Sequence, residues 1–92
     1  MVKKKSKFRH ISIGKKKYYF YHIVWEDILG DSSHFSYNEF EKMKPAIMNT
    51  YAYVFKKDKK YLWTFASYDE ETFSDRNVFP IGVIKELKKI EL

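Results

Sequence analysis

The stretch from Tyr18 to Ile28 constrains the fold of this 92-residue chain more than any other, because apolar and aromatic side chains occupy both of its faces. Successive side chains of an extended strand point to opposite faces of the sheet. One face would carry Tyr19, Tyr21, Ile23 and Trp25, and the other Tyr18, Phe20, His22 and Val24. A strand that is covered on both faces lies inside a sheet, so the pattern predicts a long central strand.

Shorter segments of β type surround this strand. We expect further strands at residues 8–13, 47–55, 61–68 and 77–79. Gly14 predicts a tight turn at residues 14–17, because glycine tolerates the positive φ that such turns need. A charged hairpin turn at residues 56–60 and an acidic loop at residues 69–76 complete the expected connections.

Helical signals are few. Ser36 and Glu39 have the spacing of a capping box, which predicts a short helix from Tyr37 to Met43 that ends before Pro45 and buries Tyr37, Phe40 and Met43. Pro80 suits the first position of a single helical turn at residues 80–83. Residues 84–92 fit a helix or a strand equally well.

These elements predict a mainly β fold. We expect a small antiparallel barrel of the SH3-like form, with one short helix and a helical turn before the last strand. An α+β open sheet is the alternative. Residues 1–7 would be a basic flexible tail and residues 8–92 a single domain, whose aromatic content of 20% can supply a dense core.

The positive charge is concentrated at one end of the chain. Residues 1–17 hold eight lysines and arginines and no acid, whereas the rest holds ten bases and twelve acids. A basic segment of this kind either keeps the protein in solution or contacts phosphates or an acidic surface. The absence of cysteine and of a signal-peptide pattern predicts a cytoplasmic protein with no membrane association.

Residues suited to catalysis or metal binding are not grouped in the sequence. His10, His22 and His34 have no ligand spacing, and only a folded-back loop could bring Asp27 and Asp31 to His34. The carboxylates Asp69, Glu70, Glu71 and Asp75 are neighbours in a polar loop, where their pKa values are not raised by burial. We therefore expect no enzyme activity, no metal and no cofactor.

The order and spacing of several short features resemble those of a known group. They are Trp25-Glu26-Asp27, Asp31-Ser32-Ser33, Glu39-Phe40, Lys44-Pro45, Thr50, Ser67, Phe79-Pro80 and Ile84. In these features the chain resembles a loose group of small tailed-bacteriophage proteins to which no activity is assigned. The resemblance implies a viral origin, the host cytoplasm as the compartment and a compact β fold. It does not extend to residues 1–17.

The expected function is binding rather than chemistry. We expect stoichiometric binding of a protein or of a small anionic, nucleotide-like ligand, in a counter-defence or host-takeover role that the resemblance suggests. Nucleic-acid binding through the basic N-terminal segment is the alternative, and edge strands could pair copies into a homo-oligomer. The candidate partner-binding residues are Lys15, Lys16, Lys17, Lys59, Lys60, Tyr61 and His34.

Overall fold

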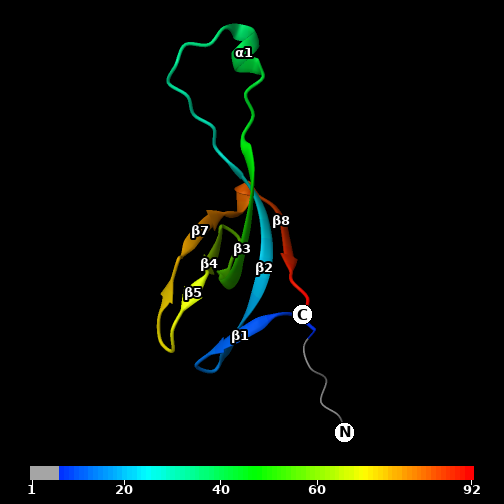
Figure 1. Ribbon diagram of the computed structural model, residues 1–92, viewed down its shortest axis with the longest axis vertical. Coiled ribbons are helices and arrows are strands. Elements are labelled where there is room, and N and C mark those ends of the chain that lie inside the picture. The colour runs from blue at the N-terminus through cyan, green and yellow to red at the C-terminus, as the bar shows by residue number, and fades with distance from the viewer. Residues whose placement is uncertain (1–6) are drawn as a thin grey trace.

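The fold of residues 7–92, which the computed structural model describes, is one curved antiparallel sheet with a long loop projecting from it (Figure 1). Six strands form the main sheet, and two further strands form a separate hairpin. The elements are β1 (His10–Ile13), β2 (Lys16–Asp27), α1 (Tyr37–Glu41), β3 (Ala46–Lys57), β4 (Tyr61–Phe65), β5 (Ser67–Tyr68), β6 (Phe73–Ser74), β7 (Asn77–Pro80), the 3-10 turn η1 (Ile81–Val83) and β8 (Ile84–Lys89). Of the predicted tail, only Lys7 lies among the described residues.

The central position predicted for the first long strand is confirmed. β2 pairs with β3 along one edge, from Phe20 opposite Tyr53 to Asp27 opposite Ala46. Its other edge is shared by two strands, since β1 covers the N-terminal part and β8 the part from Tyr21 to Trp25. Gly14 turns the chain from β1 into β2 with a φ of 61°, as expected for its turn.

Hydrophobic clusters cover both faces of β2. One cluster is built on Tyr18, Tyr53 and Phe65, and the other on Ile23, Leu62 and Phe79. Tyr18 and Ile23 differ by an odd number of positions along an extended strand, so the two clusters lie on opposite faces of the sheet. The sheet is thus the middle layer between two small cores.

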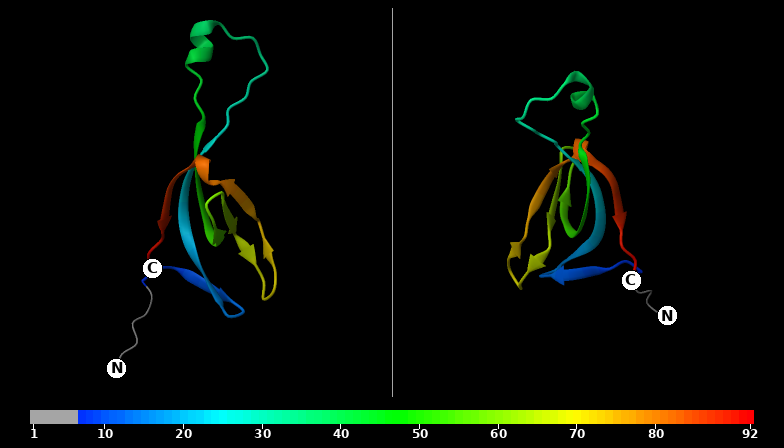
Figure 2. Two further views of the ribbon diagram at one scale, coloured as in Figure 1. Left: turned by 180° about the vertical axis from the view of Figure 1, so that it is seen from behind. Right: turned by 45° about the horizontal axis from the view of Figure 1, so that its top comes forward.

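The predicted barrel is wrong, because the sheet is not closed. The strand order is β1-β2-β3-β4-β7, with β8 paired to β2. The helical turn expected before the last strand is present as η1, and from it β7 and β8 diverge on either side of the molecule (Figure 2). Ile81 and Val83 of η1 pack on the cluster around Ile23, and no ladder joins β7 to β8 among the described residues. Residues 84–89, which fitted helix or strand, form β8.

The strand predicted at residues 61–68 is divided, and the predicted acidic loop is shorter than expected. β4 ends at Phe65, and β5 then leaves the main sheet to pair with β6 as a hairpin. Phe73 of β6 packs on the cluster around Tyr18, which explains why this part of the loop is drawn into a strand. Only residues 69–72 remain as the acidic turn.

Residues 28–45, called the projecting loop below, extend away from the sheet with α1 at their far end (Figure 1). Ser36 caps α1 as predicted: its hydroxyl accepts from the Glu39 N–H at 3.3 Å and donates to the Glu39 carboxylate at 2.9 Å. The predicted burial of Tyr37 and Phe40 is wrong, since they are 80% and 68% exposed, whereas Met43 is half-buried. The helix also ends at Glu41 rather than Met43, and none of its residues is buried.

Candidate functional site

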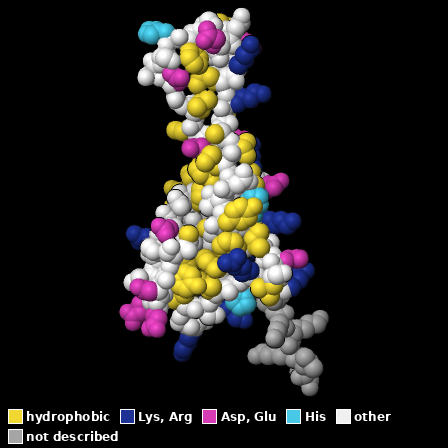
Figure 3. Space-filling model, in the orientation of Figure 1, with side chains coloured by type: hydrophobic (Ala, Val, Ile, Leu, Met, Phe, Trp, Pro, Cys, Tyr) yellow, Lys and Arg dark blue, Asp and Glu magenta, His cyan; other side chains and the backbone are white. Residues whose placement is uncertain are grey.

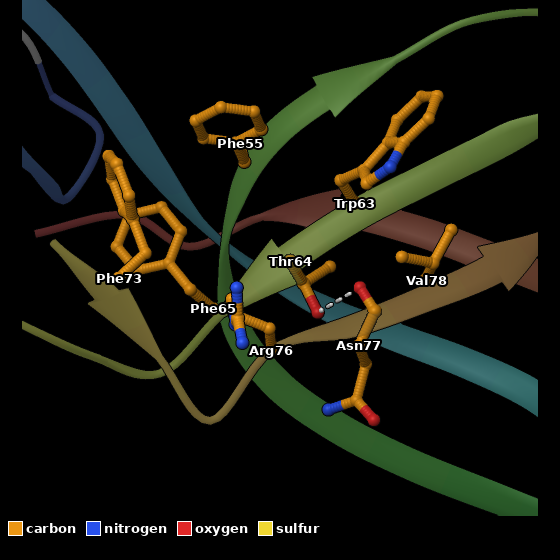
Figure 4. A pocket seen from close by; sticks show the side chains of 8 residues that line it. All are labelled: Phe55, Trp63, Thr64, Phe65, Phe73, Arg76, Asn77 and Val78. Carbon is orange, nitrogen blue, oxygen red and sulfur yellow. Dashed lines mark hydrogen bonds between the residues drawn. The ribbon is translucent and has the colours of Figure 1, made fainter.

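A cleft of about 410 Å³ lies where the end of β3 and the strands β4, β6 and β7 meet (Figure 4). The rings of Phe55, Trp63 and Phe73 surround it, and Arg76 and Asn77 bring polar groups to it. The eight lining residues are Phe55, Trp63, Thr64, Phe65, Phe73, Arg76, Asn77 and Val78. It is open to solvent, since Phe55 is 45% and Val78 53% exposed.

A β-bulge in β3 places Phe55 at this cleft. The register against β4 shifts between Val54, which lies opposite Thr64, and Lys56, which lies opposite Trp63. Phe55 is the extra residue of the bulge, so it has no partner across the ladder. Its ring centroid lies 5.1 Å from that of Phe73 and 5.9 Å from that of Tyr18, which holds it against the rim.

The opposite rim comes from the β5–β6 hairpin and the turn that follows it. Phe73 packs edge-on to Phe65, with ring centroids 4.7 Å apart. Asp75 then redirects the chain with a φ of 50°, a left-handed conformation that Asp tolerates better than most residues. Its carboxylate accepts a 2.5 Å hydrogen bond from the Ser67 hydroxyl, which ties the turn to β5. Arg76 follows directly and reaches the cleft.

The cleft offers ring faces and a cation. Arg76 lines the cleft, and the Lys56 ammonium lies 5.0 Å from the centre of the Trp63 ring, which adds a second cation beside one of the lining rings. The Thr64 hydroxyl donates to the Asn77 carbonyl at 3.4 Å and is buried. Such a surface can hold a flat or apolar group by stacking and an adjacent carboxylate or phosphate by hydrogen bonds from the guanidinium.

The structure separates the candidate residues named from the sequence into three places. Lys15, Lys16 and Lys17 lie in the β1–β2 turn and the first residues of β2, and His34 is exposed in the projecting loop. Lys59 and Lys60 lie in the β3–β4 turn and Tyr61 begins β4, beside η1, where the Lys60 carbonyl accepts from the Ile81 N–H. Tyr61 contacts Trp63, with ring centroids 5.8 Å apart, so this third group alone borders the cleft.

The carboxylates of the polar loops accept hydrogen bonds from backbone N–H groups and so hold turns. Asp31 accepts from the backbone N–H of Ser33 at 2.8 Å and Asp58 from those of Lys60 and Tyr61, both at 2.8 Å. Asp69 does the same for Glu71 and Thr72. Hydrogen bonds from Ser33 lower the pKa of Asp31, and those from Tyr61 and Lys60 lower the pKa of Asp58. Among residues 7–92, no three His, Asp or Glu side chains gather as metal ligands would.

Several cleft residues escaped the sequence analysis. Phe55 was assigned to a regular strand, because a bulge leaves no mark in the alternation of side chains. Phe73 and Arg76 were placed in a solvated loop. The one available signal was charge, since Arg76 is the only base between Lys60 and Lys85.

Comparison with known proteins found no protein-family model, no curated protein and no solved structure that matches this chain. The resemblance to bacteriophage proteins therefore stays a prediction. Within residues 7–92, no helix has the length and apolar character needed to cross a bilayer.

Proposed function

We propose that this protein acts by stoichiometric binding of another protein, and that the aromatic cleft receives a segment of that partner. The segment would insert one aromatic or aliphatic side chain between Phe55, Trp63 and Phe73 and carry a carboxylate next to it for Arg76. The proposal rests on one observation: three aromatic rings and a guanidinium line the same open cleft. Aromatic residues and arginine are the side chains that contribute most to protein interfaces.

The openness of the cleft favours a protein segment over a small nucleotide-like ligand. Pockets for small ligands usually bury about 70–90% of the ligand surface. A ligand between Phe55 and Val78 would keep a larger part of its surface in water, because both of those side chains are themselves about half exposed. A partner that continues over β4 and the β3–β4 turn would add contacts to Tyr61, Lys59 and Lys60.

The experiment uses two synthetic ten-residue peptides, each with one phenylalanine, flanked by glutamates in the first and by lysines in the second. NMR titration of the full chain should show shifts of the Trp63 indole with the acidic peptide, saturating at one peptide per chain. Arg76→Gln should weaken that binding by about tenfold, the order expected for one charge-assisted contact. Lys88→Gln removes an equal charge on β8 and should leave the affinity unchanged. Equal binding of both peptides, or an unchanged affinity in Arg76→Gln, would refute the proposal.

Nucleic-acid binding is the second candidate, and a strip of rings on the sheet supports it. The exposed Tyr51 stacks on His22 with ring centroids 4.5 Å apart, and the Arg9 guanidinium lies 4.3 Å from the centre of the nearby Phe20 ring. Single-strand binders stack bases on such rings. An oligothymidine that shifts Tyr51 and His22 while Trp63 stays unchanged would favour this function. The host-directed role suggested by the bacteriophage resemblance is tested by capture of the tagged chain's partners from host lysate, with and without nuclease.

A further inference from the structure

The outer edge of β3 is only half covered. β3 pairs with β2 from Ala46 to Tyr53, but β4 reaches it only from Tyr53 to Lys57. After Phe65 the chain leaves the sheet, because the Ala66 N–H donates to Ser74 in the β5–β6 hairpin. Among the described residues, no strand lies against the outer edge of β3 from Ala46 to Ala52.

The hydrogen bonds of Phe20 identify which backbone groups face this open edge. The Phe20 N–H donates to Arg9 and the Phe20 carbonyl accepts from Ile90, so both groups point away from β3. In an antiparallel ladder such pairs alternate with pairs that bond to each other. The residues opposite His22, Val24 and Glu26 therefore direct their own N–H and C=O groups outward. These residues are Tyr51, Asn49 and Ile47.

This edge of β3 lacks the features that prevent the edge strand of one molecule from pairing with that of another. Charged side chains, proline and short strands prevent edge-to-edge pairing in natural sheets. β8 carries Lys85, Lys88 and Lys89, and the four-residue β7 ends in Pro80. By contrast, residues 46–55 contain neither a charged side chain nor a proline, and Ile47 and Tyr51 are each 56% exposed.

We propose that the open edge of β3 pairs with the same edge of a second copy of this chain, antiparallel and centred on Asn49. The three outward residues are spaced symmetrically about Asn49, so a twofold axis there brings Ile47 opposite Tyr51 of the second copy and Asn49 opposite itself. Each of these pairs would exchange two backbone hydrogen bonds. One continuous sheet would then run through both copies.

The second copy is the fitting occupant because the edge is complementary to itself. An isologous interface needs the same patch on both sides without like charges facing each other, and the uncharged Ala46–Ala52 stretch meets that condition. Pairing with a second copy would also stabilise the ends of β2 and β3 that extend beyond the rest of the sheet. Beyond Trp25, where β8 ends its pairing, no third strand from residues 7–92 joins these two strands, and such a ribbon has low stability on its own.

The test is sedimentation equilibrium of the full chain from micromolar to submillimolar concentration. We expect a concentration-dependent dimer. Hydrogen exchange at the amides of Ile47, Asn49 and Tyr51 should slow as the fraction of chains in the dimer rises. Asn49→Lys places two lysines face to face and should raise the dimer dissociation constant by about tenfold or more at low salt. Asn49→Asp should do the same. An equimolar mixture of the two variants should recover the dimer, because opposite charges then face each other.

Two further variants separate the edge from general effects of charge and folding. Ser12→Lys adds the same charge on β1 and should leave the dimer intact. Asn49→Pro removes an outward N–H that makes no bond to β2, so the monomer should keep its fold and lose the dimer. A chain that stays monomeric throughout, or a dimer that persists in both Asn49→Lys and Asn49→Pro, would overturn the proposal.

Discussion

The sheet and the projecting loop contain similar apolar side chains, yet only the sheet buries them. Ile23 and Leu62 are fully buried between strands, whereas Phe40 and Tyr37 remain largely exposed. Figure 3 shows hydrophobic side chains on the surface of the projecting loop, which narrows where it leaves the sheet. The difference teaches that an apolar pattern specifies a local element, while burial requires a second element that the chain brings to the same place.

The largest change in stability is expected when one aromatic ring is removed from each region. Phe65→Ala removes a side chain that is 1% exposed and touches Tyr18, Tyr53 and Phe73, so it should lower the free energy of unfolding by about 3–5 kcal/mol. Phe40→Ala, the matched change in the projecting loop, should alter the free energy of unfolding by about 0.5 kcal/mol or less. Chemical denaturation of both variants measures the two free energies. Equal losses would show that the loop packs on the body in solution.

A smaller effect is expected from two aspartates that hold turns, Asp58 between strands β3 and β4 and Asp31 in the projecting loop. Backbone N–H donors lower the pKa of Asp58 from its usual 3.8, so the carboxylate stabilises the fold above that pH. Asp58→Ala should therefore lower the melting temperature at pH 7. The difference in melting temperature from the wild type should shrink as the pH falls below 3.8. It should vanish once the pH is below the lower pKa of the folded state.

Asp31→Ala is the matched change in the loop, where hydrogen bonds from Ser33 lower the pKa in the same way. It should leave the melting temperature unaltered at every pH, because loss of a local turn there does not open the sheet. Melting curves between pH 2 and pH 7 test both variants. A pH-independent deficit in Asp58→Ala would show that its carboxylate acts through something other than its charge.

The smallest effect on global stability is expected from Ser36→Ala at the start of α1. Loss of a helix cap costs about 0.5–2 kcal/mol of local helix stability. Since α1 buries no residue, that cost should appear as faster hydrogen exchange at the Phe40 amide, which donates to the Ser36 carbonyl. The free energy of global unfolding should not move. If Ser36→Ala lowered both the protection of the Phe40 amide and the free energy of global unfolding, the projecting loop would unfold together with the sheet.

Local patterns predicted the elements of this fold well, and contacts between distant residues account for what they missed. Apolar side chains on both faces of one stretch identified β2, and the Ser36 and Glu39 pair identified the helix start. The open sheet was only the alternative prediction, because closure depends on which strand β8 meets. The cleft could not be read, because Phe55 reaches it through a bulge, and Arg76 through a hairpin that Phe73 anchors.

The pairing of β2 with β8 also sets the order in which the molecule can form. Tyr21 pairs with Lys89, and Phe8 bridges to Glu91, so strands from the two ends of the chain must meet. Sheets that depend on such distant pairs fold in milliseconds to seconds, because the entropy of closing a long loop must be overcome first. Ile84 and Leu87, which pack on the cluster around Ile23, lie more than 60 residues after Ile23 in the chain. Until β8 pairs, this edge of β2 is open to other chains, so aggregation of the incomplete sheet competes with folding and lowers the yield.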